Sequence, residues 1–224
     1  MEQIATVVPL GRIELEADIV VPANAGRLVV FAHGSGSSRR SPRNRQVAAL
    51  LNRGAIGTVL VDLLTGDEGL RDVRTAELRF DIPLLGQRLI EITDWIGRQP
   101  GLRRLALGYF GASTGAAAAL VAAARRPQAV QAVVSRGGRP DLAGPALREV
   151  LAPVLFIVGE NDPAVLSLNS NAMAQLPRGT ESRLEVVPGA THLFEEPGAL
   201  ETVAALARDW FQARLSPGVD FRTE

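Results

Sequence analysis

The chain has 224 residues, enough for one domain with a large hydrophobic core or for two small ones. Basic and acidic residues both number 24, so no excess charge favours binding to nucleic acid or to an anionic membrane surface. Cysteine is absent from the sequence, which excludes disulfides, thiolate metal ligands and a cysteine nucleophile.

The N-terminus has no basic-then-apolar signal pattern, and no apolar run reaches membrane-spanning length. We therefore expect a soluble cytoplasmic protein with no nucleic-acid or membrane partner. We expect it to need no metal or cofactor and to be a monomer or a homodimer.

The spacing of apolar residues predicts strands that alternate with helices along the chain. The first strand, over 13–21, alternates apolar and polar residues and is expected at an edge of the sheet. The other predicted strands are 27–32, 58–64, 103–110, 130–135, 153–158 and 182–187. The predicted helices are 44–53, 82–98, 114–126, 144–151, 164–176 and 198–214. The polar segment 66–81 is expected to be a long loop.

Strands that alternate with helices indicate an α/β fold, a mostly parallel sheet with helices on both faces, in a single domain over 1–224. Ligands of such sheets bind at the carboxyl ends of the strands, and each candidate residue below follows a predicted strand. Residues 136–152 leave room for one short helix before the next strand, so no large lid domain is expected.

A turn rich in small residues, Phe-Ala-His-Gly-Ser-Gly-Ser-Ser at 31–38, closes the second predicted strand. Small residues let a backbone N–H approach a substrate oxygen, so the Ser35 N–H is assigned as an oxyanion donor. We expect His33 to hold this loop by hydrogen bonds, and His33 and Gly34 are also possible substrate contacts. A phosphate-binding turn is the alternative, but the lysine of a P-loop and a G-x-G-x-x-G motif are both missing.

Four arginines follow this turn, and we expect them to form a solvated face. They are Arg39, Arg40, Arg43 and Arg45. Basic runs usually remain in water, and no interleaved aromatic residues favour nucleic acid.

The segment Gly-Ala-Ser-Thr-Gly at 111–115 is a G-x-S-x-G motif between a predicted strand and a predicted helix. A sharp strand–turn–helix connection lifts the side chain of Ser113 clear of the sheet, as a nucleophilic serine requires. The helix N-terminus behind it offers free N–H groups, and the Thr114 N–H is assigned as the second oxyanion donor. Small residues gather at many such turns, so the motif depends on the rest of the sequence.

Two arginines follow the next strand, in Ser-Arg-Gly-Gly-Arg-Pro-Asp at 135–141. Arg136 or Arg139 is a candidate for binding a substrate carboxylate through a forked guanidinium. The alternative is a surface ion pair with Asp141 or Glu149. Asp141 is also a second candidate for the acid that orients a catalytic histidine.

Asp162 follows the strand 153–158 in Gly-Glu-Asn-Asp-Pro, and His192 follows the strand 182–187 in Gly-Ala-Thr-His-Leu-Phe. An Asp at such a site can simply cap a helix, and a lone histidine can be a surface residue. The order Ser…Asp…His, however, is the one that the nucleophile-elbow fold uses. Because each residue closes a separate strand of one sheet, the three can converge.

The segments around these three residues resemble the triad segments of the α/β-hydrolase superfamily, and more narrowly its small, lidless dienelactone hydrolase-like branch. The resemblance covers essentially the whole chain. It implies Ser113 as nucleophile, Asp162 as acid and His192 as base, with an oxyanion hole from the Ser35 and Thr114 amides. Dienelactone hydrolases proper carry a cysteine nucleophile, so the serine points to an esterase rather than to dienelactone as substrate. Similar proteins also occur fused to phosphoribosyltransferase domains, which suggests such a domain as a partner.

We therefore expect a serine hydrolase that cleaves small or short-chain carboxylic esters through an acyl-enzyme. Its substrate would be a small molecule, because a site without a lid is open and shallow. Two alternatives remain: thioester or acyl-transfer chemistry on the same triad, and a non-catalytic binding module on the same fold.

Overall fold

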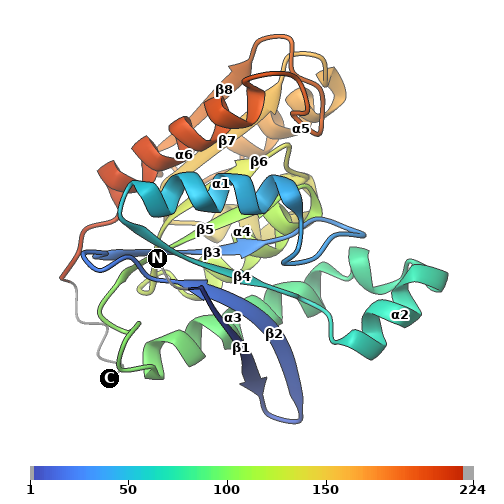
Figure 1. Cartoon of the computed structure of the whole chain (residues 1–224). Helices are drawn as coiled ribbons and strands as arrows, with labels where there is room; N and C mark the ends of the chain where they lie inside the picture. Colours follow the sequence, from blue (N-terminus) through green and yellow to red (C-terminus); the bar gives the residue numbers. More distant parts are fainter. Residues whose placement is uncertain (1–2, 219–224) are drawn as a thin grey trace.

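The computed structural model describes residues 3–218, and its strands are joined in one sheet (Figure 1). The strands are β1 (Gln3–Leu10), β2 (Ile13–Val20), β3 (Arg27–Ala32), β4 (Ile56–Val61), β5 (Ala106–Ala112), β6 (Val130–Arg136), β7 (Val154–Gly159) and β8 (Ser182–Val187). The α-helices are α1 (Pro42–Arg53), α2 (Gly66–Thr75), α3 (Ile82–Arg98), α4 (Thr114–Arg125), α5 (Pro163–Met173) and α6 (Ala199–Arg214). Two 3₁₀ helices, η1 (Leu78–Phe80) and η2 (Pro140–Glu149), complete the described elements.

The strand order is β1-β2-β4-β3-β5-β6-β7-β8, and every pair from β4 to β8 is parallel. Only β2 runs antiparallel to its neighbours β1 and β4. The carboxyl ends of β3, β5, β6, β7 and β8 therefore meet at one edge of the sheet. The predicted mostly parallel sheet is confirmed.

Two hydrophobic layers lie on opposite faces of this sheet, because successive side chains of a strand point to opposite sides. In β3, Leu28 and Val30 belong to the layer under α3 and α4, whereas Val29 and Phe31 belong to the layer under α1 and α6. Figure 1 shows α1 and α6 together on the near face, with α3 and α4 behind the sheet. Helices on both faces are what the alternating sequence predicts.

The alanine-rich α4 is buried on nearly all its sides, and the side chains of residues 116–120 are inaccessible to solvent. Small side chains let this helix lie close to the sheet while it packs against α3 and η2. A helix that is apolar all round is expected at such a central position. The turn that precedes α4 is thereby fixed by packing on several sides.

The N-terminal edge differs from the prediction, because β1 pairs with β2 along its whole length. The strand expected at the edge is therefore internal, and Leu15 and Ala17 are buried. β1 went unpredicted because most of its side chains are at least partly exposed and show no strong apolar pattern.

The segment expected to be a loop at 66–81 contains α2 and η1, so that prediction is wrong. A capping box starts α2: the Glu68 N–H donates to the Thr65 hydroxyl, and the Thr65 N–H donates to the Glu68 carboxylate. Asp72 is its only buried residue, which is why no apolar stripe reveals the helix.

The segment between β6 and β7 holds η2 where a short helix over 144–151 was expected. Gly144 has a φ of 54°, and Pro145 lacks an N–H, so an α-helix cannot continue there. Within residues 3–218, no lid domain covers the carboxyl edge of the sheet.

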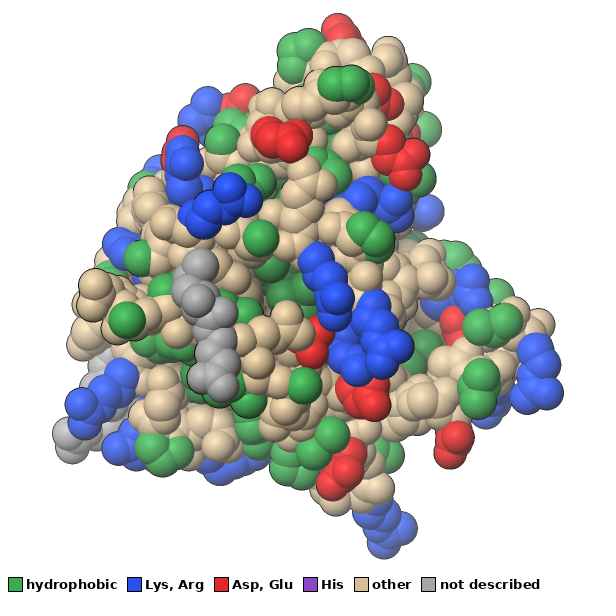
Figure 2. Space-filling view, in the orientation of Figure 1, with side chains coloured by type: hydrophobic (Ala, Val, Ile, Leu, Met, Phe, Trp, Pro, Cys, Tyr) green, Lys and Arg blue, Asp and Glu red, His purple; other side chains and the backbone are tan. Residues whose placement is uncertain are grey.

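Basic and acidic side chains are interspersed on the face seen in Figure 2, with apolar side chains between them. This mixture agrees with the zero net charge of the chain. Across the described part of the chain, no helix is both long and apolar enough to cross a membrane.

Candidate active site

Ser113 lies in a strained turn between β5 and α4. Its φ of 50° and ψ of −122° place it in a region that non-glycine residues rarely occupy. The surrounding backbone holds it there: the Ser113 N–H donates to the Arg136 carbonyl at 3.2 Å, and the Ser113 carbonyl accepts from the Arg139 N–H at 3.0 Å. The strained conformation is therefore held by the end of β6 and the loop that follows it, and not by the turn alone.

The two glycines of the motif are required by close backbone contacts. A Cβ on Gly111 would lie 2.4 Å from the Ala116 Cα, and one on Gly115 would lie 2.2 Å from the Ala32 carbonyl oxygen. Neither position can hold a side chain without moving backbone. The glycines thus allow α4 to start directly against β3 and β5, with Ser113 at its tip.

Asp162 and His192 are brought together by the loops after β7 and β8. The His192 Nδ1 lies 2.6 Å from the Asp162 Oδ2, and the Asn161 N–H donates to the Ala190 carbonyl at 2.9 Å. Asp162 occupies the N-cap position of α5, yet within the described structure its side chain makes no capping bond. The carboxylate is therefore used to orient a histidine and not to cap a helix.

The hydrogen bond to Asp162 determines which ring nitrogen of His192 remains free to accept a proton. With the Nδ1–H donating to the carboxylate, the Nε2 of His192 is the unprotonated nitrogen of the neutral ring. Asp162 is mostly buried, whereas the His192 side chain is 39% exposed. The imidazole thus presents a free lone pair at an accessible position.

Ser113 and His192 line the same cavity of about 240 Å³ at the carboxyl edge of the sheet. Among the described residues, no hydrogen bond joins the Ser113 hydroxyl to His192. Catalytic hydrogen bonds are often long before substrate binds, so the shared cavity is the informative observation. The other lining residues are Gly34, Ser35, Ser37, Ser41, Arg43, Asn44, Ala112, Arg136 and Leu193.

The predicted oxyanion donors lie on either side of Ser113. Ser35 lines its cavity, and Thr114 begins α4 and lines a neighbouring cavity that Ser35 also borders. Gly34 brings the first loop close, because a Cβ there would lie 3.0 Å from the Ser113 Cβ. Neither the Ser35 nor the Thr114 N–H donates a loop or turn bond within residues 3–218. Both amides are available to a ligand.

His33 is buried, and backbone groups occupy both of its ring nitrogens. Its Nε2 accepts from the Leu63 N–H at 3.0 Å, and its Nδ1 lies 3.0 Å from the Gly34 carbonyl. Burial lowers the pKa of His33, which favours the neutral ring that these two bonds require. His33 therefore holds the loop, as expected, and has no ring nitrogen left for a substrate.

The two candidate arginines after β6 have different environments. Arg139 forms a two-pronged ion pair with Asp141, at 2.8 and 2.7 Å, which is the predicted alternative to substrate binding. This pair also engages the Asp141 carboxylate, and it is Asp162 that contacts His192. Arg136 is buried and lines the cavity beside Ser113.

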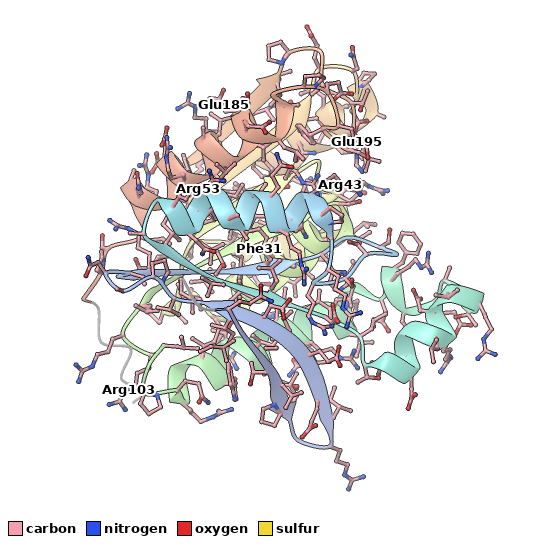
Figure 3. The ribbon with its side chains drawn as sticks, in the orientation of Figure 1. Phe31, Arg43, Arg53, Arg103, Glu185 and Glu195 are labelled. Atoms are coloured by element: carbon pink, nitrogen blue, oxygen red, sulfur yellow. The ribbon has the colours of Figure 1, made fainter. Side chains whose placement is uncertain are left out.

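The N-terminus of α1 contributes residues to the cavity that sequence reasoning missed. Arg43 lines it, together with Ser41 and Asn44, although the basic run was expected to be a solvated face. Figure 3 shows Arg43 at the end of α1 nearest Glu195, and its Nη1 lies 2.8 Å from the Glu195 carboxylate. The sequence did contain one indication that these residues lie near the site, because the basic run directly follows the loop that contains Ser35.

Comparison with known proteins identifies the family. The profile described as the dienelactone hydrolase family matches residues 87–216, more than half of the chain. The chain belongs to the dienelactone hydrolase family. A crystal structure of a dienelactone hydrolase from Anabaena variabilis is 54% identical, has a TM-score of 0.94, and is matched over 96% of this chain and 99% of that one.

Two further proteins are similar to this chain. A protein of Mycobacterium tuberculosis H37Rv, provisionally named as a phosphoribosyl transferase, is 55% identical over 93% of this chain. The match covers 46% of that protein, so the chain spans about half the length of this curated relative. Est1E from Butyrivibrio proteoclasticus is 16% identical, with a TM-score of 0.77 over 93% of this chain and 98% of that one, and shows the shared fold alone. Together with the sheet topology, the family identifies this chain as a hydrolase of the α/β type.

Proposed function

We propose that this chain is a serine hydrolase that cleaves small or short-chain carboxylic esters, with Ser113 as nucleophile, His192 as base and Asp162 as acid. The observation that carries the proposal is the 2.6 Å contact between His192 Nδ1 and Asp162 Oδ2 at the edge of the cavity that Ser113 also lines. A strained, partly exposed serine and an oriented histidine that line one cavity are what acyl transfer requires.

The reaction follows from the position of the protons. The His192 Nε2 takes the Ser113 hydroxyl proton as the oxygen attacks the ester carbonyl carbon, and Asp162 stabilises the resulting imidazolium. The alcohol leaves with that proton, and an acyl-enzyme remains. His192 then takes a proton from water as the water oxygen attacks the acyl carbon. It gives this proton to the Ser113 oxygen as the acid leaves, which restores both residues.

The developing negative charge on the carbonyl oxygen needs donors that are already in place. The Ser35 and Thr114 N–H groups are the proposed pair, since both amides lie beside Ser113 and neither donates a loop or turn bond within the described residues. Loss of one such donor typically costs a factor of about 10² to 10³ in turnover.

The proposed preference for small esters comes from the short segment over the site. Only η2, a 3₁₀ helix that packs against α4, lies in the connection where a lid would enter. A cavity of about 240 Å³ suits a short acyl chain better than a long one.

The test is hydrolysis of aryl esters of increasing acyl length by the wild type and by Ser113→Ala. We expect short acyl chains to give the highest kcat/KM, and Ser113→Ala to lose activity by a factor of about 10³ or more while keeping its circular dichroism spectrum. Ser167→Ala, at an exposed position on α5, is the matched control and should retain full activity. A Ser113→Ala variant with most of its activity, or a preference for long chains, contradicts the proposal.

The same triad also serves thioester hydrolysis and acyl transfer. Replacing the ester panel by thioesters with the same acyl groups distinguishes these chemistries. The phosphoribosyl transferase name of the longer M. tuberculosis relative suggests that such a domain works beside this one, and we propose it as a partner.

A further inference from the structure

Arg136 is a buried positive charge without an acidic partner. Its residue is only 7% exposed, and its Nε has no hydrogen-bond acceptor within the described structure. Within the described residues its side chain makes one long hydrogen bond, 3.5 Å from the Nη2 to the Asn44 Oδ1, and its guanidinium lies 5.7 Å from the centre of the Phe194 ring. Burying a charge without a partner destabilises the folded state, so such a group is expected to have a role in binding or catalysis.

Arg88 is also a buried arginine, but its charge is fully paired. It is 4% exposed, and its guanidinium binds both oxygens of Glu68, at 2.6 and 2.5 Å, as well as the Leu63 carbonyl. Arg136 has no such carboxylate, and it lies in the cavity that Ser113 also lines. The missing counter-charge of Arg136 is therefore expected to come from a ligand.

The N-terminus of α1 opens on the same cavity. Ser41 caps this twelve-residue helix by accepting from the Asn44 N–H, and Ser41, Arg43 and Asn44 all line the cavity. Pro42 has no N–H and the Asn44 N–H is used by Ser41, so the Arg43 N–H is the first-turn amide that remains, and together with the helix dipole it favours an anion at this position. The Nε of Arg43 is likewise buried without a partner among the described residues, while its Nη1 binds Glu195.

The lining of this cavity is positively charged. Two guanidinium groups, the serine hydroxyls and a helix N-terminus meet there, and none of its described lining residues is Asp or Glu. A carboxylate has two oxygens to accept these donors, whereas a phosphate monoester has three terminal oxygens and up to two negative charges. Forked guanidiniums and helix N-termini both suit phosphate.

We propose that Arg136, with Arg43 and the N-terminus of α1, binds a phosphate group on the ester substrate and thereby presents the ester carbonyl to Ser113. This rests on the proposed esterase function, because the phosphate is only an anchor. The bond that breaks is the one between the acyl carbon and the alcohol oxygen, water supplies the new oxygen, and the phosphate is unchanged. The substrate class is a small phosphorylated carboxylic ester.

The first test measures binding without any reaction. Inorganic phosphate is titrated at constant ionic strength into the wild type, Arg136→Met and Arg103→Met, with heat or melting temperature as the readout. Arg103 is exposed and remote from the cavity, so its variant controls for the same loss of net charge. We expect the wild type and Arg103→Met to bind alike, and Arg136→Met to bind about tenfold more weakly or worse.

Acetate is the comparison anion in the same titration. We expect it to bind clearly more weakly than phosphate. Equal binding of acetate and phosphate overturns the phosphate assignment, and no binding of either, or equal phosphate binding by Arg136→Met, overturns the subsite. If Arg136→Met does not fold, Arg43→Met, at a partly exposed position, provides the same comparison.

The second test is kinetic and uses two aryl esters whose acyl chains end in a phosphate or in a neutral methyl ether. We expect the wild type and Arg103→Met to prefer the phosphorylated ester in kcat/KM, and the preference to collapse in Arg136→Met, with partial recovery in Arg136→Lys. If the enzyme hydrolyses the neutral ester but shows neither phosphate binding nor a preference for the phosphorylated ester, the phosphate subsite is contradicted and the esterase proposal stands. Phosphate binding without hydrolysis of any ester removes the esterase and leaves the subsite.

Discussion

The Asp162 carboxylate contacts the Nδ1 of His192, and this contact distinguishes Asp162 from the second acid that the sequence offers. The other, Asp141, is held by Arg139 through both of its oxygens. The two carboxylates follow neighbouring strands, but only one orients an imidazole. The family resemblance already favoured Asp162, but spacing along the chain does not reveal which acid has a competing arginine.

The two acids therefore give a matched pair of substitutions. We expect Asp162→Asn to reduce kcat for an aryl ester by about 10⁴, because an amide no longer fixes the tautomer in which Nε2 is the base. Asp141→Asn loses only the ion pair with Arg139 and should retain nearly full turnover. Steady-state kinetics on both purified variants checks this, and comparable losses in the two would contradict the assigned acid.

The residues of the site differ in how well the sequence predicts their positions. The positions of Ser113 and His192 could be predicted because each follows a strand that the apolar pattern reveals. The isolation of Arg136 and the approach of Arg43 could not, because they depend on which side chains meet across the carboxyl edge. Pairing of arginines is a property of the fold and not of a local motif.

At the scale of elements, the junction of β5, α4 and β3 is set by glycine. Gly115 lies so close to the Ala32 and His33 carbonyls that any side chain must displace the loop carrying Ser35. This loop and the serine turn are therefore a single packed unit, and substitution at the glycine tests it.

We expect Gly115→Ala to destabilise the protein by at least about 1–3 kcal/mol, as overpacking against backbone does, and to reduce ester hydrolysis. Gly97→Ala is the matched control, because Gly97 lies exposed within α3 with open space around it. In a helix, this change should stabilise by about 0.5–1 kcal/mol. Urea denaturation of both variants gives the two free energies, and a neutral Gly115→Ala would show that the contact is not tight.

The helix α2 is attached to the domain mainly through polar contacts. Glu68 binds the buried Arg88, and Asp72 accepts from the Arg79 side chain and from two backbone N–H groups. Leu70 and Val73 remain exposed on it. A helix held by ion pairs has no periodic apolar stripe, which explains why the sequence reads as a loop there.

This attachment should weaken in acid. The hydrogen bond from Arg88 lowers the pKa of Glu68 below its ordinary value of 4.5. The ion pair therefore contributes fully above about pH 4.5, and its contribution is lost as the pH falls through the lower pKa of the folded state. We expect the hydrogen-exchange protection factors of α2 to fall selectively in this range, while those of α3 persist. Glu68→Gln should show low protection in α2 at neutral pH, and unchanged protection would argue against the account.

At the scale of the whole molecule, the sheet determines which segments meet. Parallel strands from β3 to β8 bring together loops that are far apart in the sequence, and the alternation of strands and helices predicts this arrangement. The strand β1, and with it the antiparallel hairpin with β2, could not be predicted in the same way, because most of the side chains of β1 are at least partly exposed and show a weak pattern. The sequence thus predicts the parallel part of the sheet more clearly than the side formed by β1 and β2.

The central claim is that Ser113 is an activated nucleophile, and covalent labelling tests it most directly. A fluorophosphonate probe is added to the wild type, Ser113→Ala and His192→Ala, and the modified peptide is identified by mass spectrometry. We expect one label per chain on Ser113, none on Ser113→Ala, and labelling of His192→Ala slowed by about 10³ or more, since the base is missing. No label on the wild type, or a label on another serine that persists in Ser113→Ala, would contradict the claim.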